Sequence, residues 1–471
     1  MTATAPPPAP SSYRVLMVAP TSFFGDYGCH VRILEEARTL QAMGHHVRIV
    51  TYHNGNDVPG LTVQRCLPIP WRERYEVGSS RHKLAFDVLL SARVLQSALA
   101  FRPDVIHGHL HEGALIGGAV ARLVRRPIVF DFQGSLSGEM VDHGFVREGG
   151  RWQAAARWLE RRIDHRPEAI VTSTAFATEH LIDDFDVPRA RIVALPDCVN
   201  AATFRPDVLT PAERAAARRA LGLPEAAPIV VYLGLLARHQ GTNVLLHAAR
   251  KVIDARPDVR FLVMGYPGTE WYARRAEQLG LHGRILFTGR IPYDQAPAHL
   301  ALGDIAVAPK ISTTEGSGKL LNYMAMALPT VTFDTPVNRE YLGDDGLFAA
   351  PFADPDAFAT RILDTLADPA GARATGERLR ARAVEGYDWA RAGETLVDVY
   401  RRVGAGGHGQ RMDAHPSSPA LPPREASSPS PRLGGGGRGE RALGRRVERA
   451  EGRRPERPSV RPSNTPSSPP K

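Results

Sequence analysis

The segment from Ala308 to Asn322 carries the strongest chemical signal, because an expected strand leads through a glycine-containing loop into an expected helix. Gly316 and Gly318 let backbone N–H groups approach a ligand closely, and the N–H groups of a first helical turn are unpaired. Lys319 adds a full positive charge beside them. We therefore predict a diphosphate site, in preference to an ordinary capped turn with a solvated lysine.

Glu315 directly precedes these N–H groups, so we expect it to accept hydrogen bonds from sugar hydroxyls. The segment also contains Ser317-Gly-Lys, which superficially suggests a P-loop. The required spacing fails, since Thr313 stands where that motif needs glycine. Nucleotide triphosphate hydrolysis is therefore not the preferred interpretation.

A second glycine-containing loop spans Thr21 to Gly28 and precedes an expected helix from Val31 to Met43. Gly25 and Gly28 lie before that helix, so its positive end would point toward a ligand. The G-x-G-x-x-G fingerprint is absent, and a plain turn is nearly as well supported.

Three histidines follow the expected strand Asp104–His107, in the order His107, His109 and His111. We expect His109 to point away from the other two, which argues against one metal site formed by all three. With no cysteine or carboxylate at ligand spacing, we predict no metal. We instead expect His109 to face the ligand as a polar contact or proton relay, with Gln133 from the next strand end beside it.

The stretch Arg151–Arg166 combines two tryptophans with five arginines. Such a basic aromatic helix could lie on an anionic membrane surface, or Trp152 and Trp158 could be core residues. We favour the core interpretation.

The elements that must position these residues alternate between short apolar runs and helical periodicity, first from about residue 13 and again from about residue 228. This pattern predicts α/β architecture with parallel sheets. We expect a disordered lead at 1–12 and a Rossmann-like domain at 13–205. A second such domain would cover 206–386, a returning helix 387–403, and a disordered basic tail rich in Pro, Gly, Ser and Arg would cover 404–471.

Composition places the positive charge in the expected tail. The chain carries a net charge of +9, yet residues 404–471 hold 13 of the 59 Lys and Arg and only 6 of the 50 Asp and Glu. We therefore expect a nearly neutral folded part and no specific nucleic-acid partner. Three scattered cysteines, no secretory signal and no long apolar run predict a cytoplasmic protein, with possible peripheral contact at the inner face of the membrane.

Several short motifs occur in order through residues 13–403, and together they are specific. They are the first glycine loop followed by His30-Val31, Gly44-His-His-Val47, Asp104-Val-Ile-His-Gly-His109, Leu195-Pro-Asp-Cys-Val-Asn200, Phe204-Arg-Pro206, Gly234 to Gly241, Thr288-Gly289, and Glu315-Gly-Ser-Gly318 through Met324-Ala-Met-Ala-Leu-Pro329. The chain thereby resembles the retaining, family-4 type glycosyltransferases of GT-B architecture, in which two Rossmann-like domains face each other across a cleft.

The resemblance implies transfer of a hexose-type sugar from a UDP- or GDP-linked donor to a glycan or lipid-linked acceptor. Retention is implied, and neither a metal nor another cofactor is expected. Catalytic roles would fall on His109, Gln133, Glu315 and Lys319. Donor-binding roles would fall on Gly25, Gly28, Gly234, Arg238, Lys310, Gly316, Ser317, Gly318, Leu320 and Asn322.

This sequence departs from the family pattern at the phosphate site. Asn322 stands at the second acidic position of the family's Glu-x7-Glu, and Leu235 and Gln240 replace its arginine and lysine. Gln133 replaces a histidine. We expect Lys319 to offset the lost charge, with Lys310 and Arg238 next in order. The alternatives are an inactive scaffold that binds nucleotide or glycan, or a sugar-nucleotide epimerase.

Overall fold

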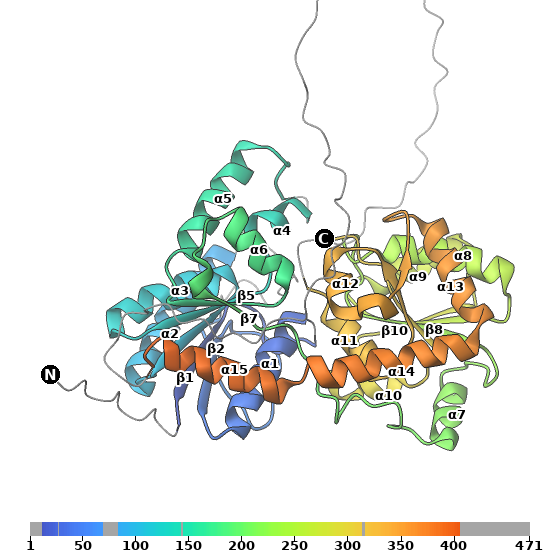
Figure 1. Ribbon diagram of the computed structural model, residues 1–471, viewed down its shortest axis with the longest axis horizontal. Coiled ribbons are helices and arrows are strands. Elements are labelled where there is room, and N and C mark those ends of the chain that lie inside the picture. Colours follow the sequence, from blue (N-terminus) through green and yellow to red (C-terminus); the bar gives the residue numbers. More distant parts are fainter. Residues whose placement is uncertain (1–11, 27, 69–82, 143–144, 313–315, 406–471) are drawn as a thin grey trace, which may run out of the picture. The chain divides into compact units, whose positions relative to one another are not determined.

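Short strands, most of them buried along most of their length, form two parallel sheets (Figure 1). The computed structural model describes residues 12–26, 28–68, 83–142, 145–312 and 316–405. The expected lead (apart from residue 12), nearly all of the expected tail and Glu315 lie outside the described residues.

The first sheet contains seven parallel strands in the order β3-β2-β1-β4-β5-β6-β7. Its elements are β1 Arg14–Ala19, α1 Gly28–Ala42, β2 His46–Thr51, β3 Thr62–Arg65, α2 Lys83–Phe101, β4 Val105–His109, α3 Leu110–Val124, β5 Ile128–Phe132, α4 Leu136–Asp142, α5 Arg151–Asp164, β6 Ala169–Thr172, α6 Ala175–Asp183 and β7 Ile192–Ala194.

The second sheet contains six parallel strands in the order β10-β9-β8-β11-β12-β13. Its elements are α7 Pro211–Ala220, β8 Ile229–Leu233, α8 Thr242–Ala255, β9 Arg260–Met264, α9 Thr269–Gln278, β10 Ile285–Gly289, α10 Ala296–Leu300, β11 Ile305–Ala308, α11 Gly318–Ala325, β12 Thr330–Phe333, α12 Pro336–Leu342, β13 Leu347–Ala349, α13 Pro355–Ala367 and α14 Pro369–Gly386. The predicted α/β fold class with two Rossmann-like sheets is confirmed.

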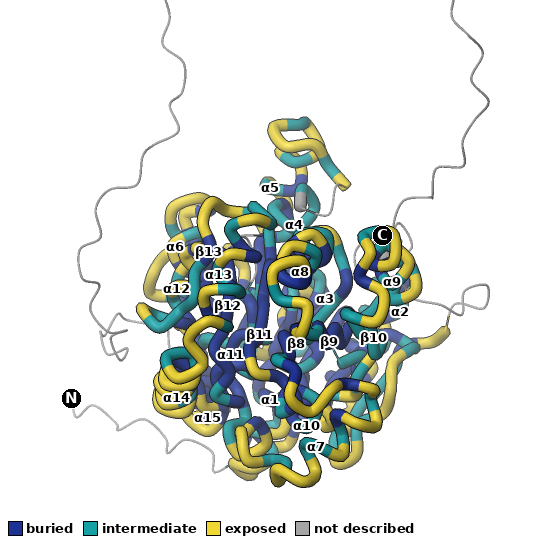
Figure 2. Tube along the Cα trace, turned by 90° about the vertical axis from the view of Figure 1, so that its right-hand side faces the viewer, coloured by how far each residue is buried: buried dark blue, intermediate teal, exposed yellow. Residues whose placement is uncertain are grey.

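Helices cover both faces of each sheet, so both faces are buried. Because successive residues of a strand point to opposite sides, each strand contributes side chains to two cores. In β1, Val15 and Met17 join the core shared with α1, whereas Leu16 and Val18 join the core under α2 and α3. The second sheet follows the same rule. Figure 2 shows β8, β9 and β11 as buried strands, with exposed residues on the helices outside them.

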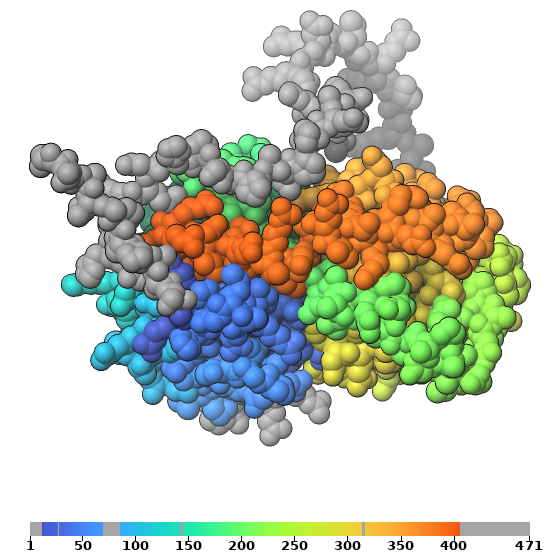
Figure 3. All heavy atoms as spheres, turned by 60° about the horizontal axis from the view of Figure 1, so that its bottom comes forward, coloured from blue at the N-terminus to red at the C-terminus, as the bar shows by residue number. Residues whose placement is uncertain are grey.

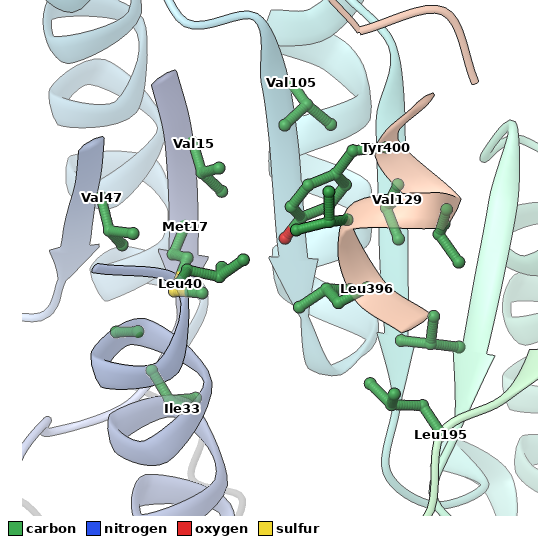
Figure 4. Close-up of a cluster of buried hydrophobic side chains, with 14 of the residues drawn as sticks. Val15, Met17, Ile33, Leu40, Val47, Val105, Val129, Leu195, Leu396 and Tyr400 are labelled. Carbon is green, nitrogen blue, oxygen red and sulfur yellow. The ribbon is translucent and has the colours of Figure 1, made fainter. Parts of the chain in front are cut away.

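The last described helix, α15 (Trp389–Arg402), belongs to the core of the first sheet. Leu396 and Tyr400 pack there with Val15 and Met17 (Figure 4). The preceding helix α14 instead packs on α11, so the two consecutive helices run from one sheet's core to the other's (Figure 3). This is the arrangement expected of a returning helix.

Two element boundaries differ from the sequence-based expectation near the histidines. The strand β4 extends to His109 rather than ending at His107, and α3 begins at Leu110 rather than at residue 113. A single residue with a left-handed backbone, Leu110 at φ 60°, joins the two elements. Gly108 makes this tight joint possible, because a Cβ atom there would lie 2.6 Å from the carbonyl oxygen of Gly113.

Candidate active site

In the second sheet, Lys319 lies in the first turn of α11 and reaches the loop that follows β8. Its Nζ donates to Gln240 Oε1 at 2.9 Å and to the Tyr232 hydroxyl at 3.2 Å, and it lies 4.5 Å from the centre of the Tyr232 ring. Gly234 is packed so closely that a Cβ atom would lie 2.6 Å from Nζ. Two residues predicted for the donor site, Gly234 and Lys319, are therefore neighbours.

The position of Lys319 bears directly on the altered phosphate loop. Gln240 stands where the resemblance places a lysine, and the amino group of Lys319 lies within hydrogen-bond distance of the Gln240 side chain. Burial raises the pKa of Tyr232 well above its usual value, so the hydroxyl beside Lys319 stays neutral. A positive charge thus occupies the place of the missing lysine, although it comes from another element.

The loop before α11 has its own internal contacts. Lys310 is buried, and its Nζ donates to the carbonyl oxygen of Gly316 at 2.7 Å. Ser317 caps α11 with its backbone, and its buried Oγ has no hydrogen-bond partner within the described residues. Gly316 leaves room for the Asp197 side chain, because a Cβ atom at Gly316 would lie 2.9 Å from Asp197 Oδ2.

The remaining predicted donor residues have different surroundings. Leu320 is fully buried in the core of the second sheet, and its N–H donates to the Ser317 carbonyl oxygen. Asn322 is half-buried on α11, Gly318 is the first residue of that helix, and Arg238 is exposed in the loop after β8. No contact of these side chains identifies a ligand, so their predicted roles stay predictions.

In the first sheet, His30 organises the glycine loop that follows β1. The Gly25 N–H donates to His30 Nδ1 at 2.6 Å, so Nε2 carries the proton and faces the Thr21 hydroxyl. Burial lowers the pKa of His30 to about 3, with Arg290 adding to the effect. The Gly25 amide is thus occupied, and Gly28 is the first residue of α1 rather than a loop residue.

The three histidines lie in two different environments, since His107 and His109 belong to β4 and His111 belongs to α3. His107 and His109 stack with ring centres 4.5 Å apart, because alternate residues of a strand share a face. Our expectation that His109 points away from His107 is therefore wrong. His111 is set apart because the chain has already entered α3, where it contacts Glu160 and Asp164.

His109 is oriented by a buried carboxylate. Its Nδ1 lies 2.9 Å from Asp131 Oδ2, and Gln133 Nε2 donates to the same oxygen at 2.6 Å. The predicted pair of His109 and Gln133 is thus brought together through Asp131. The buried Nε2 of His109 has no hydrogen-bond partner within the described residues. The ring therefore presents one ordered nitrogen as an acceptor.

The residue that holds Asp131 is Arg32 on α1. Its guanidinium contacts both oxygens of Asp131 at 2.9 and 3.1 Å, and it also contacts Glu36 Oε1 at 3.1 Å and Asp197 Oδ1 at 2.9 Å. Burial alone would raise the pKa of Asp131, but Arg32 and His109 outweigh it and hold that pKa well below its usual range. Burial and the neighbouring Asp131 raise the pKa of Glu36.

Sequence reasoning missed this network. Asp197 belongs to a motif noted for the family resemblance, and Asp131 stands two residues before Gln133. Arg32 and Glu36 have the i, i+4 spacing of a helix-surface ion pair. The available signal was that Arg32 and Glu36 adjoin the apolar residues Ile33 and Ala37 of the same helix.

The helix α5 presents its tryptophans to solvent. Trp152 is 67% exposed and Trp158 60% exposed, so the favoured core interpretation is wrong. Arg151 and Arg162 lie over the faces of these two rings. The buried side of α5 is formed instead by Ala156, Glu160, Ile163 and Asp164.

Comparison with known families gives this geometry a context. Residues 27–198 match the family model described as Glycosyl transferase 4-like domain, and residues 227–368 match Glycosyl transferases group 1. This chain is a group 1 glycosyltransferase. The second matched segment contains every strand of the second sheet, the first contains every strand of the first sheet except β1, and the predicted resemblance is confirmed.

Curated relatives of this glycosyltransferase share about a quarter of its sequence. The D-inositol 3-phosphate glycosyltransferase of Kineococcus radiotolerans is 24% identical over 80% of this chain and 90% of its own length. The phosphatidyl-myo-inositol mannosyltransferase of Mycobacterium leprae is 25% identical over 84% and 98%. The GDP-mannose-dependent alpha-(1-6)-phosphatidylinositol monomannoside mannosyltransferase of Mycolicibacterium smegmatis is 29% identical over 52% and 65%.

Solved structures share the fold of this glycosyltransferase. HepE from Anabaena, in complex with UDP and glucose, has a TM-score of 0.67 at 15% identity and covers 83% of this chain and 99% of its own. Sucrose-phosphate synthase from Thermosynechococcus elongatus has a TM-score of 0.70 at 18% identity, over 83% and 98%. The GT-B architecture is thus established. No helix within the described residues is long and apolar enough to cross a bilayer.

Proposed function

We propose that this glycosyltransferase moves a hexose from a UDP- or GDP-linked sugar to a glycan or lipid-linked acceptor, with retention and without a metal. Nucleotide-sugar use is supported by the UDP in the HepE complex and by the GDP-mannose in the name of the Mycolicibacterium relative. The names of three relatives contain inositol phosphate or phosphatidylinositol, which favours an acceptor with a polyol phosphate group.

The observation that carries the proposal is the position of Lys319 beside Gln240 and Gly234. A leaving nucleoside diphosphate gains negative charge in the transition state, and a fixed cation at a helix start stabilises that charge selectively. Lys319 supplies the charge that the usual lysine would have contributed from the loop after β8.

The transfer requires two bond changes at the anomeric carbon. The bond to the diphosphate oxygen breaks, the acceptor hydroxyl oxygen forms the new bond, and the hydroxyl proton passes to the departing diphosphate. Retention through front-face attack places acceptor and leaving group on one side of the sugar. His109 and Gln133 would orient sugar hydroxyls from the first sheet, since Asp131 fixes both of them.

A thermal-shift panel of UDP-, GDP-, ADP- and TDP-sugars tests donor binding, followed by assay of released nucleoside diphosphate from any sugar that stabilises the protein. We expect Lys319→Ala to lower turnover by about 10²–10³-fold, the usual effect of removing one transition-state donor. Lys251→Ala, which removes an exposed lysine paired with Asp356, is the control.

Each alternative has its own outcome in these assays. Donor binding without turnover would identify an inactive scaffold, and conversion of the donor without acceptor to an epimeric sugar would identify an epimerase. Unchanged turnover in Lys319→Ala would refute the role given to Lys319.

We also propose that the cytoplasmic enzyme contacts the anionic inner face of a membrane through α5. The helix combines exposed Trp152 and Trp158 with arginines beside both rings. Sedimentation with phosphatidylglycerol vesicles should decrease in Trp152→Ala/Trp158→Ala, and Leu123→Ala, at a 70% exposed position on α3, should behave as wild type. Equal sedimentation with phosphatidylcholine vesicles would contradict an electrostatic contribution.

A further inference from the structure

A second buried cluster of ionisable groups lies where α5 packs against α3. His111 comes from the first turn of α3, and Glu160 and Asp164 are one turn apart on α5. Their side chains are 5%, 0% and 0% exposed. The cluster takes no part in the proposed sugar transfer.

The distances inside the cluster are long for hydrogen bonds. His111 Nε2 lies 3.5 Å from Asp164 Oδ1 and 3.6 Å from Glu160 Oε1, whereas charge-assisted hydrogen bonds are about 2.7–2.9 Å long. Zinc binds nitrogen and carboxylate oxygen at about 2.0–2.2 Å, so two ligands of a tetrahedral site are about 3.3–3.6 Å apart. The observed separations match that edge length.

The unpaired atoms of the cluster face one another. His111 Nε2 and both carboxylate oxygens of Asp164 are buried without a hydrogen-bond partner in the parts of the chain that the structure describes. Glu160 is held in place because its two oxygens accept the N–H groups of Leu136 and Ser137 at 3.0 and 2.9 Å. Groups from both helices therefore point at one location.

The charge balance also favours a cation. Two buried carboxylates outnumber one imidazole even when the imidazole is protonated, and Glu112 adds further negative potential at His111. A divalent cation with a neutral histidine would neutralise the two carboxylates completely.

The other histidine–carboxylate group of the first sheet differs in this respect. Glu36, His107, His109 and Asp131 also lie close enough to share an ion. There the Arg32 guanidinium already lies between the two carboxylates and pairs with both. A permanently charged arginine is thus built into that cluster. In the other cluster, as far as the chain is described, the two carboxylates face only His111, whose pKa rises to about 9 because Asp164 and Glu160 outweigh its burial.

We propose that His111, Glu160 and Asp164 bind a divalent transition metal, with zinc as the best match to one imidazole and two carboxylates. Three protein ligands leave the fourth tetrahedral position to water. The site would tie α5, with its exposed tryptophans, to α3. This proposal departs from our expectation that the protein binds no metal, and the proposed metal takes no part in the sugar transfer.

The test measures metal in the full chain, purified without a histidine tag. We expect about one zinc per chain in the wild type and a more than ~10-fold loss in His111→Gln and Asp164→Asn, as removal of a ligand predicts. His180→Gln is the matched control, because His180 and Asp184 form an i, i+4 pair 2.7 Å apart with the Asp184 side chain 48% exposed.

A second measurement keeps the proposal falsifiable if both variants fail to fold. Wild-type protein stripped with a chelator should have a lower Tm that zinc restores. Reloading with Co²⁺ should give the visible absorption of a tetrahedral site. Wild-type protein that binds neither Zn²⁺ nor Co²⁺, or an unchanged zinc content in His111→Gln, would overturn the proposal.

Discussion

Replacing Arg32 by methionine should destabilise the first sheet strongly. The variant removes the guanidinium contacts to Asp131, Glu36 and Asp197, and Asp131 is 0% exposed. Breaking a buried pair by removing one partner typically costs about 3–5 kcal/mol. That is a large part of the roughly 5–15 kcal/mol that stabilises a folded protein.

A separate argument limits the size of the loss. The variant can avoid an uncompensated buried charge by protonating Asp131. At pH 7 this costs about 4 kcal/mol, from roughly three pKa units at 1.36 kcal/mol each. His109 and Gln133 still donate to Asp131, which reduces the loss further. We therefore expect a loss of about 3–4 kcal/mol at pH 7.

The pH dependence provides the discriminating measurement. In the wild type, the low pKa of Asp131 contributes stability above its unfolded pKa of about 4, and this contribution disappears at lower pH. In Arg32→Met, folding must instead add a proton to Asp131, and this costs less as the pH falls toward 4, so the deficit of the variant should shrink between pH 7 and pH 4. Urea unfolding, followed by circular dichroism, measures both values.

Two further variants complete this experiment. Arg161→Met removes an exposed ion pair with Asp186 and should cost only about 0–1 kcal/mol. The double variant Arg32→Met/Asp131→Asn should be more stable than the sum of the two single losses predicts. A loss below about 1 kcal/mol for Arg32→Met, or one independent of pH, would refute the assignment of a buried charge pair.

Two other predictions follow from individual positions. His30 has a folded pKa of about 3, so the unfolded chain binds an extra proton below about pH 6.5. The contribution of neutral His30 to the free energy of unfolding is complete above that pH and falls by about 2 kcal/mol at pH 5. The urea midpoint of His30→Gln should therefore decline less between pH 7 and pH 5 than that of the wild type. An equal decline in the two proteins would contradict this. Gly108→Ala should destabilise by about 1–3 kcal/mol through the close Gly113 carbonyl. Gly118→Ala, whose Cβ would be 3.8 Å from Ile128, should instead gain up to about 1 kcal/mol; equal Tm changes would refute the steric explanation.

The fold class could be predicted from the sequence, because the periodicity of apolar residues indicates where strands and helices lie. Apolar runs alternate with helical patterns twice, and each run became a strand of a parallel sheet. The meeting of Gly234 and Lys319 was also predictable, since both follow strands that are neighbours, β8 and β11. Carboxyl ends of parallel strands meet at one edge.

The buried charges could not be predicted in the same way. Arg32 and Asp131 are 99 positions apart, and no local pattern shows that their elements bring them into contact. The prediction for Trp152 and Trp158 was wrong in the opposite direction. Their apolar character alone suggested burial, whereas the structure exposes both rings to solvent. Solvent exposure of a helix face depends on what packs against it, which tertiary structure decides.

The contact between His107 and Tyr400 has a consequence for how the protein is made. The hydroxyl of Tyr400 lies 2.7 Å from His107 Nδ1. The two residues are 293 positions apart in the sequence, and the whole second sheet lies between them in the chain. During synthesis, the strands around Val15 and Met17 leave the ribosome long before α15 exists to cover them. The domain of the first sheet is thus translated first but completed last. The apolar face that α15 covers stays exposed while the domain of the second sheet is synthesised.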